Sequence, residues 1–470
     1  MTERRYDLVV VGLGSAGLVA AKFAARLGVK VAAVERDRVG GDCLWTGCVP
    51  SKALLASARA AHAMRHADRY GLASVEPEID TARVLERIRR IQGEIERTDD
   101  NPELLAAEGI DVHMGAARLT GPGTLEVEGV GALRTRFVLL CTGSRAAVPD
   151  VEGLESAGYL TSESFWEQER LPESLLILGG GPIAVEIAQA CVRLGVRVTV
   201  LQRGERILAR DEPDLADRLG ELLRADGVEL VVGADAESVS VEDGERVVRA
   251  TVAGEPREWR AAEIMVAAGR APNVEGLGLE EAGVETTSEG VTVDRALRTS
   301  VPSVYAAGDL AGRYLFTHTA GYEAGIAVRN MFVPAASKAT ELVPWCTFTD
   351  PELAHVGLTE AEARSQHRWG VAVWRQDLSG TDRARTDDAT EGEIRIVAVR
   401  TKIVGAHVLA PNAGDLIGEL TLAIEEGKRM HDLAQLIHVY PTQSVAFSQL
   451  GGKATYALTD RFKFLVRSRA

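Results

Sequence analysis

Residues 7–17 read DLVVVGLGSAG, an apolar run that leads directly into a glycine-rich segment. The run predicts a buried strand over residues 7–11, and a helix of small and apolar residues is predicted to follow it, to about residue 27. A second strand, residues 31–34, ends at Glu35. Glycines at such a turn let a pyrophosphate approach the helix N-terminus, and the acid can bond an adenosine ribose. This order of elements predicts a dinucleotide-binding unit.

The same pattern returns in residues 174–202, which predicts a second dinucleotide-binding unit. An apolar strand precedes the glycine-rich segment GGGPIA at residues 179–184, and a helix and a strand follow. Where the first copy has an acid, the second has Gln202 followed by Arg203. An acid repels a 2′-phosphate and arginine accommodates one, so this site is predicted to prefer NADPH over NADH. The alternative is that Arg203 is a solvated surface side chain.

Residues 40–52, GGDCLWTGCVPSK, place two cysteines at a predicted loop-to-helix junction. Cys43 and Cys48 lie among glycines, and Pro50 suits the first turn of a helix, where a missing N–H costs no hydrogen bond. The Ala- and Leu-rich run 51–59 is predicted to continue that helix. Free N–H groups and the helix dipole lower the pKa of a thiol at such a junction. The segment therefore favours a redox-active pair.

Two other interpretations of the cysteine pair are buried core residues and half of a zinc site. A zinc site needs further ligands. The other cysteines, Cys141, Cys191 and Cys346, are scattered without pair spacing. Redox use is the preferred interpretation.

The rest of the chain predicts helices and strands around these units. The further elements expected are an amphipathic helix over 80–100, a meander of short strands over 112–127, strands 137–141, 264–268 and 303–307, a hairpin over 234–259, a second hairpin from strands 393–399 and 403–409, and a helix over 412–426. Residues beyond 341 carry no glycine fingerprint, so they are expected to form an interface or substrate-closing domain.

Composition excludes several classes of function. The chain of 470 residues is 46% hydrophobic and 26% charged, as in ordinary globular proteins of several domains. A formal net charge of −15 disfavours binding to nucleic acid or to an anionic membrane. Five cysteines make no secreted disulfide framework. Without a predicted signal peptide or membrane span, we expect a cytoplasmic protein.

Two dinucleotide units combined with a cysteine pair resemble the flavin-dependent pyridine nucleotide–disulfide oxidoreductases, such as dihydrolipoamide dehydrogenase, glutathione reductase and mercuric reductase. The resemblance covers essentially the whole chain and includes TSVPSVYAAGD (299–309), AGRAPN (268–273) and VPWCTFTDPELAHVGLT (343–359). It implies an α/β fold with two doubly wound, Rossmann-like domains, one inserted in the other, and an α+β C-terminal dimerisation domain. The implied segments are 1–147 and 272–341 for FAD binding, 148–271 for NAD(P) binding and 342–470 for dimerisation.

The resemblance also implies roles for individual residues. Cys48 would be the charge-transfer thiol against the flavin and Cys43 the interchange thiol facing the acceptor. Lys52 would sit beside the flavin, paired with Glu186. Electrons would pass from NADPH (or NADH) through FAD to a Cys43–Cys48 disulfide and on to a small-molecule acceptor. The implied cofactor-binding positions are Gly12, Gly14, Ser15, Ala16, Gly17, Glu35, Gly41, Asp42, Lys52, Ala117, Thr142, Gly143, Ser144, Gly179, Gly181, Pro182, Ile183, Gln202, Arg203, Gly269, Asp309, Leu315, Phe316, Thr317 and His318.

One motif departs from the family. Its disulfide-reducing members carry a catalytic His before Pro-Thr and a Glu soon after, contributed across a homodimer interface. Here Tyr440 replaces the His and Val445 replaces the Glu, with His438 as a possible stand-in. The C-terminal cysteine pair usual in mercuric reductases is also missing from residues 459–470. The acceptor therefore stays open: a quinone or metal ion is one alternative, and a non-enzymatic flavoprotein redox sensor is another.

Overall fold

The computed structural model describes residues 4–334 and 337–461, so the end of the C-terminal tail discussed above lies outside the described residues. Its first sheet has the order β3-β2-β1-β6-β5-β4, with β19 joined to β6. β1 pairs in parallel with both β2 and β6. The elements of this part are β1 (Arg4–Val11), α1 (Ser15–Arg26), β2 (Val31–Glu35), α2 (Gly41–Trp45), α3 (Cys48–Arg65), η1 (Ala67–Tyr70), α4 (Thr81–Thr98), α5 (Pro102–Ala107), β3 (Asp111–Met114), β4 (Ala117–Gly121), β5 (Thr124–Val127), β6 (Gly131–Leu140) and β7 (Ser144–Ala146).

A second parallel sheet follows, with the order β11-β10-β9-β15-β8, and β12, β13 and β14 form a small antiparallel sheet beside it. The elements are α6 (Leu154–Ala157), β8 (Leu160–Thr161), η2 (Ser164–Glu167), β9 (Ser174–Leu178), α7 (Pro182–Arg193), β10 (Arg197–Gln202), α8 (Pro213–Ala225), β11 (Glu229–Val232), β12 (Ala234–Glu242), β13 (Glu245–Val252), β14 (Glu255–Ala261), β15 (Glu263–Val266) and β16 (Arg270–Pro272).

The chain then returns to the first sheet through β19, whose register places Val304 opposite Val138 of β6. α9 packs against α1 and shares its hydrophobic core. The elements are β17 (Thr286–Thr287), β18 (Gly290–Val291), β19 (Val304–Ala306), η3 (Gly308–Ala311) and α9 (Thr317–Phe332). The domain boundaries themselves stay a prediction.

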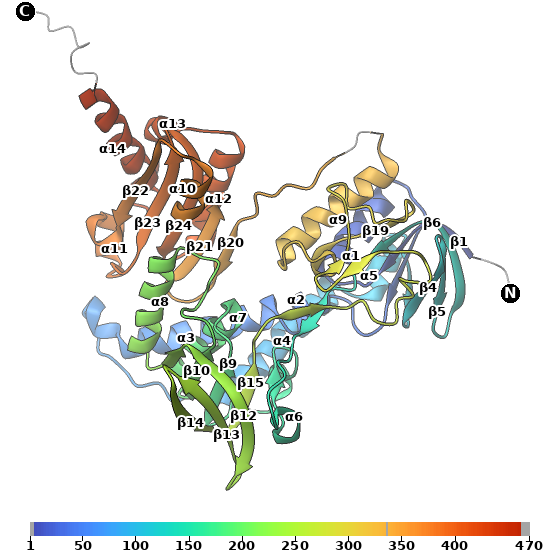
Figure 1. The fold of residues 1–470 in the computed structure, drawn as a ribbon, viewed down its shortest axis with the longest axis horizontal. Helices are drawn as coiled ribbons and strands as arrows, with labels where there is room; N and C mark the ends of the chain where they lie inside the picture. The colour runs from blue at the N-terminus through green and yellow to red at the C-terminus, as the bar shows by residue number, and fades with distance from the viewer. Residues whose placement is uncertain (1–3, 335–336, 462–470) are drawn as a thin grey trace, which may run out of the picture.

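The C-terminal part is an antiparallel sheet with the order β20-β21-β24-β23-β22. Its core is built from that sheet and from residues of α12, α13 and α14. Figure 1 shows it above the second unit, whose hydrophobic core it joins through Leu353 and Leu409. The elements are β20 (Trp345–Thr347), β21 (Glu352–Gly357), α10 (Glu360–Gln366), β22 (Val371–Asp377), η4 (Leu378–Gly380), α11 (Asp382–Thr386), β23 (Glu393–Val399), β24 (Lys402–Ala410), α12 (Ala413–Glu425), α13 (Met430–Gln435) and α14 (Val445–Arg461).

The fold class predicted from sequence is confirmed, and three local predictions need correction. β3 was expected in the meander, but it pairs in parallel with β2, where Val112 lies opposite Ala33. The hairpin expected over 234–259 has a third strand. α3 begins at Cys48 rather than at Pro50, because Ser51 N–H already donates to Gly47 O at 3.1 Å. Pro50 is tolerated there because first-turn N–H groups have no partner within the helix.

Helices α3 and α4 pack away from the first sheet, although they belong to its sequence segment. Leu54 and Ile88 share one hydrophobic core with Ile177 of β9 and Val185 of α7. In Figure 1, α3 lies beside α7 and far from β1. The helix that begins at Cys48 is thus anchored on the second dinucleotide unit.

Candidate active site

A cavity of about 1760 Å³ lies where the three parts of the chain meet. Both glycine turns, both cysteines and the Lys52–Glu186 pair line it. Every site residue predicted from sequence lines this cavity except Gly17 and Tyr440, which are both in the described part of the chain. The sequence positions therefore converge in space, while their roles stay predictions.

The first glycine turn is built for a ligand at the start of α1. The N-cap of α1 is Gly14, which has no side chain to cap the helix, so the N–H groups of its first turn are free for an anion. A Cβ at Gly12 would collide with Cys141 O, and one at Gly41 would come within 2.6 Å of Gly14 Cα. The glycine turn and the segment that carries the cysteines can lie this close together only because neither residue has a side chain at the contact.

Glu35 holds this turn from the end of β2. One carboxylate oxygen accepts Leu13 N–H at 2.7 Å, and the other accepts Asp37 N–H at 2.9 Å. The Glu35 side chain is buried and lines the cavity, at the position where the sequence predicts contact with an adenosine ribose. The free helix N-terminus, the cradle and the acid together fit a dinucleotide such as FAD.

The second glycine turn repeats these features at α7. Gly181 caps α7 without a side-chain hydrogen bond, and a Cβ at Gly179 would collide with Ala267 O. Gln202 donates to Arg206 O at 3.2 Å, while Arg203 is exposed on the cavity rim. The turn fits a second dinucleotide, and the role of Arg203 toward a 2′-phosphate stays a prediction.

The two cysteines differ sharply in acidity. Both thiols are free, with Cys43 in α2 and Cys48 at the start of α3. The pKa of Cys48 is lowered to about 6: a hydrogen bond from Cys43 is the largest cause, Thr317 and Lys52 act in the same direction, and burial opposes them. The pKa of Cys43 is raised, because its thiol proton is held by Cys48 and because it is buried. At neutral pH, Cys48 is the thiolate and Cys43 the thiol.

Thr317, the first residue of α9, sits directly against Cys48. Its Oγ1 lies 3.2 Å from Cys48 Sγ. A helix N-terminus and a hydroxyl donor together stabilise a thiolate. Thr317 was predicted only as a cofactor contact, and nothing in the local sequence signals its contact with a cysteine so distant along the chain.

Lys52 and Glu186 form an ion pair at the wall of the cavity. Lys52 Nζ lies 2.9 Å from Glu186 Oε2 and 4.4 Å from the centre of the Phe348 ring. The other Glu186 oxygen accepts Phe348 N–H at 2.9 Å. The pair therefore joins α3, α7 and the C-terminal part, and it places a cation on the cavity wall.

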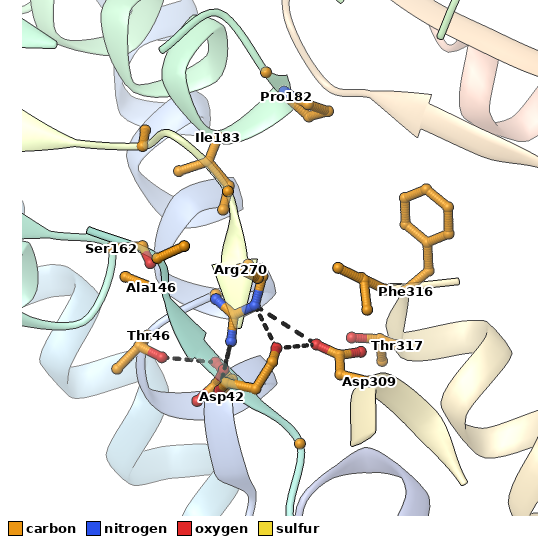
Figure 2. A pocket seen from close by; sticks show the side chains of 18 of the residues that line it. Asp42, Thr46, Ala146, Ser162, Pro182, Ile183, Arg270, Asp309, Phe316 and Thr317 are labelled. Carbon is orange, nitrogen blue, oxygen red and sulfur yellow. Dashed lines mark hydrogen bonds and ion pairs between the residues drawn. The ribbon is translucent and has the colours of Figure 1, made fainter. Parts of the chain in front are cut away.

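Arg270 is a cavity residue that sequence reasoning missed. Figure 2 shows its guanidinium between Asp42 and Asp309, with ion pairs to both. Ser144 Oγ donates to Asp309 at 2.5 Å. Burial raises the pKa of Asp309, and Arg270 counters that effect. The position of Arg270 directly after Gly269, at the exit of an apolar strand, was the signal that could have identified it.

The replaced motif lies on the surface of the C-terminal part, outside the cavity of this single chain. Tyr440 is 66% exposed, and its hydroxyl donates to Asp382 at 2.6 Å. That bond raises the pKa of Tyr440, so the phenol is a still weaker acid than usual. His438 is paired with Glu419 at 3.0 Å, and its side chain is only 8% exposed.

Across residues 4–334 and 337–461, no group of three or more His, Cys, Asp or Glu side chains is arranged to hold a metal ion. Over the same ranges, every helix is too short or too polar to cross a membrane.

Comparison with known proteins gives consistent matches. A sequence profile described as "Pyridine nucleotide-disulphide oxidoreductase" matches residues 6–324. A second, described as "Pyridine nucleotide-disulphide oxidoreductase, dimerisation domain", matches residues 343–450. Mercuric reductase of Streptomyces lividans is 36% identical over 455 residues, which is 94% of each chain. Dihydrolipoyl dehydrogenase of Bacillus subtilis is 33% identical over 464 residues, 94% of this chain and 97% of the relative.

Among solved structures, the chain resembles RclA, an HOCl-induced flavoprotein disulfide reductase from Escherichia coli. The TM-score is 0.85 at 26% identity, over 95% of this chain and 99% of RclA. A Cu(II) complex of RclA matches with a TM-score of 0.84 at 25% identity, over 96% of this chain and all of RclA.

Proposed function

The chain belongs to the pyridine nucleotide-disulphide oxidoreductase family, whose members use FAD and NAD(P)H, and from that premise we propose an electron path and an acceptor for it. Electrons from NADPH pass by way of FAD to a Cys43–Cys48 disulfide. The resulting dithiol then reduces an acceptor that needs no dedicated proton relay. Thiophilic metal ions are the acceptor class we favour.

The polarised cysteine pair carries this proposal. Cys48 is held as a thiolate by Cys43, Thr317 and Lys52, in the same cavity as both glycine turns. When bound, FAD supplies the two-electron chemistry between nicotinamide and sulfur. The chain itself keeps Cys48 ionised, and it leaves Cys43 protonated as the thiol that meets the acceptor.

Lys52 serves the same path through its charge. Its ammonium group, fixed by Glu186, would stabilise negative charge that accumulates beside it during reduction. Lys52 also lowers the pKa of Cys48. One cation therefore assists both the arrival of electrons and their storage as a thiolate.

The missing dyad favours an acceptor other than an ordinary disulfide. A His–Glu pair returns a proton to the leaving thiolate, whereas an exposed phenol bonded to Asp382 is a poor proton carrier. With Cys48 as the thiolate and Cys43 as the thiol, oxidation of the pair to a disulfide releases two electrons and one proton. Those electrons reduce one Hg(II) to Hg(0) or two Cu(II) to Cu(I), and the proton passes to solvent.

The names of similar proteins support two classes of acceptor, a metal ion and a disulfide. Mercuric reductase and the Cu(II) complex of RclA support a metal ion. Dihydrolipoyl dehydrogenase and the disulfide reductase RclA support a disulfide, which is the second candidate.

An acceptor panel tests the proposed function. NADPH oxidation by the purified flavoprotein is measured with Cu(II), Hg(II), a quinone, lipoamide and glutathione disulfide, for wild type and Cys43→Ser. We expect metal-ion reduction to be fastest and to be lost in Cys43→Ser. Fast lipoamide reduction by wild type would overturn the choice of acceptor. Failure of NADPH to reduce the bound flavin at all would favour the redox-sensor alternative.

The NADPH preference predicted from Gln202-Arg203 is tested by one substitution. We expect kcat/KM to be higher with NADPH than with NADH, and Arg203→Ala to narrow the gap by about tenfold, because a charge-assisted bond to phosphate is lost. Arg197→Ala is the control, since it lies exposed at the opposite end of the same strand. A higher kcat/KM with NADH in wild type would contradict the prediction.

Dimerisation is expected from the C-terminal part. The dimerisation-domain profile covers residues 343–450, and Ile437 and Val439 are exposed apolar side chains within it. At micromolar concentration, sedimentation should give about twice the single-chain mass of 50.3 kDa. Ile437→Asp should shift the mass toward that of one chain, because a charge at a dimer contact would have to be buried.

Val241→Asp, an exposed apolar site on the second unit, is the control for that change. A wild-type mass of one chain would contradict the dimer.

A further inference from the structure

A two-stranded ribbon joins the two dinucleotide units at the cavity. β7 and β16 pair antiparallel, with Arg270 opposite Ala146. β7 follows the end of β6 in the first sheet, and β16 follows the end of β15 in the second. The ribbon therefore lies between the carboxyl ends of both parallel sheets, and Arg270 projects from it into the cavity. The electron path proposed above assigns Arg270 no part.

The guanidinium of Arg270 links three separate segments. Its Nε donates to Ser144 Oγ at 2.6 Å, and its Nη2 donates to Ser144 O at 2.9 Å. The same group pairs with Asp42 of α2 and with Asp309 of η3, the latter at 3.5 Å. The Arg270 side chain is only 16% exposed, whereas its partner Asp42 is half exposed at the cavity wall. Figure 2 shows the guanidinium between the two carboxylates.

One positive charge thus separates two negative ones. Asp42 and Asp309 act on each other electrostatically, since Asp42 raises the pKa of Asp309. Without Arg270, two carboxylates would face each other in a partly buried corner. Repulsion between them would push α2 away from η3.

Asp42 also controls the turn between the two cysteines. Its backbone carbonyl accepts Thr46 N–H at 2.9 Å and Gly47 N–H at 2.6 Å. Those two bonds close the chain between Cys43, the next residue after Asp42, and Cys48, the next after Gly47. Asp42 therefore has two contacts: its carboxylate pairs with Arg270, and its backbone carbonyl closes the turn between the two cysteines.

We propose that Arg270 is a positioning residue that, by holding the Asp42 carboxylate, fixes the turn between Cys43 and Cys48 and so sets how readily the pair closes into a disulfide. The inference rests on the proposed function only in taking this pair as the redox pair. Formation of a disulfide demands narrow geometry, so a displaced α2 disfavours the oxidised form.

The test is the thiol–disulfide equilibrium of the purified FAD-loaded protein with glutathione. The enzyme dithiol reacts with one glutathione disulfide. The Cys43–Cys48 bond forms and the glutathione bond breaks, and two glutathione thiols leave with the electron pair, one proton from Cys43 and one proton from solvent. We expect Arg270→Gln to lower the equilibrium constant for enzyme disulfide formation by about tenfold, a coupling typical of residues in contact. Arg270→Lys should recover part of the loss, because it keeps the charge without the planar fork.

Arg145→Gln is the matched control. Arg145 belongs to the same ribbon but pairs with Glu275, at 2.8 Å, on an exposed side. Its replacement should leave the equilibrium constant unchanged. In an Asp42→Asn background, Arg270→Gln should add no further loss, because the carboxylate it acts through is gone.

An unchanged constant in Arg270→Gln, or an equal change in Arg145→Gln, would overturn the proposal. If Arg270→Gln does not retain FAD, Arg270→Lys decides: a wild-type constant in that flavin-loaded variant overturns the proposal as well. The assay contains neither nicotinamide nor metal acceptor, so an error in the proposed acceptor leaves it intact. Failure of wild type itself to form the disulfide would instead refute the proposed electron path.

Discussion

Replacement of Cys48 by serine is expected to abolish the long-wavelength absorbance that a thiolate gives beside oxidised FAD, and to slow turnover by roughly 10³-fold or more. A serine hydroxyl does not ionise near neutral pH, so neither the charge-transfer contact nor thiol exchange can form. Cys43→Ser should keep the absorbance band while losing acceptor reduction. The reverse pattern would mean that the two roles are exchanged.

The same band should report the acidity of Cys48. Its pKa of about 6 predicts that the band is present at neutral pH, falls to half its size near pH 6 and is lost below it as the thiolate is protonated. Absorbance of the reduced protein, followed while the pH is lowered, measures the midpoint. Thr317→Val removes a hydroxyl that lowers this pKa, so it should move the midpoint upward. A midpoint near the ordinary thiol value would contradict the geometry around Cys48.

Restoration of the family's dyad by Tyr440→His combined with Val445→Glu should raise disulfide reductase activity by ~10²–10⁴, the usual worth of general acid–base catalysis. The histidine would exchange protons near neutral pH, which the phenol cannot do while bonded to Asp382. Val445 is the first residue of α14, where a glutamate is favoured by the helix dipole. Metal-ion reduction should stay flat. The measurement is NADPH oxidation with lipoamide and with Cu(II).

Tyr440→Phe is the control for that gain, because it removes the bond to Asp382 without adding a base. It should leave disulfide reduction as slow as in wild type. If wild type already reduces lipoamide at ~10–10³ s⁻¹, the dyad is not what limits exchange. His438 with its Glu419 partner would then be the group to examine.

Sequence predicted the parts of the site that depend on local pattern. The two glycine turns and Glu35 line one cavity, and strand, turn and helix around them follow from short-range preferences, whereas Glu186 was expected only from the family resemblance. Contacts between segments that are distant along the chain could not be predicted from the sequence. Thr317 against Cys48 and Arg270 between Asp42 and Asp309 depend on how separate units pack, which no local pattern encodes.

The errors in the first residue of α3 and in the partner strand of β3 also arise because local sequence does not determine these features. α3 begins before Pro50 because a hydrogen bond to Gly47 O extends it, and proline alone does not fix the first residue of a helix. β3 looked like part of a meander because short strands carry little information about their partner. The sequence around Tyr440 also does not indicate which part of the protein the side chain contacts. Its exposed position outside the cavity of one chain depends on how the C-terminal part packs.

The shared core of α3 and α4 with the second unit has a consequence for how this enzyme can be recombined. A chimera that exchanges residues 148–271 with a relative would cut through the contact of Leu54 and Ile88 with Ile177 and Val185. The incoming sheet would meet helices shaped for another partner, and mismatched cores cost stability and order. A chimera designed to change the nicotinamide specificity should therefore exchange residues 48–98 together with the second unit, so that this shared core stays intact.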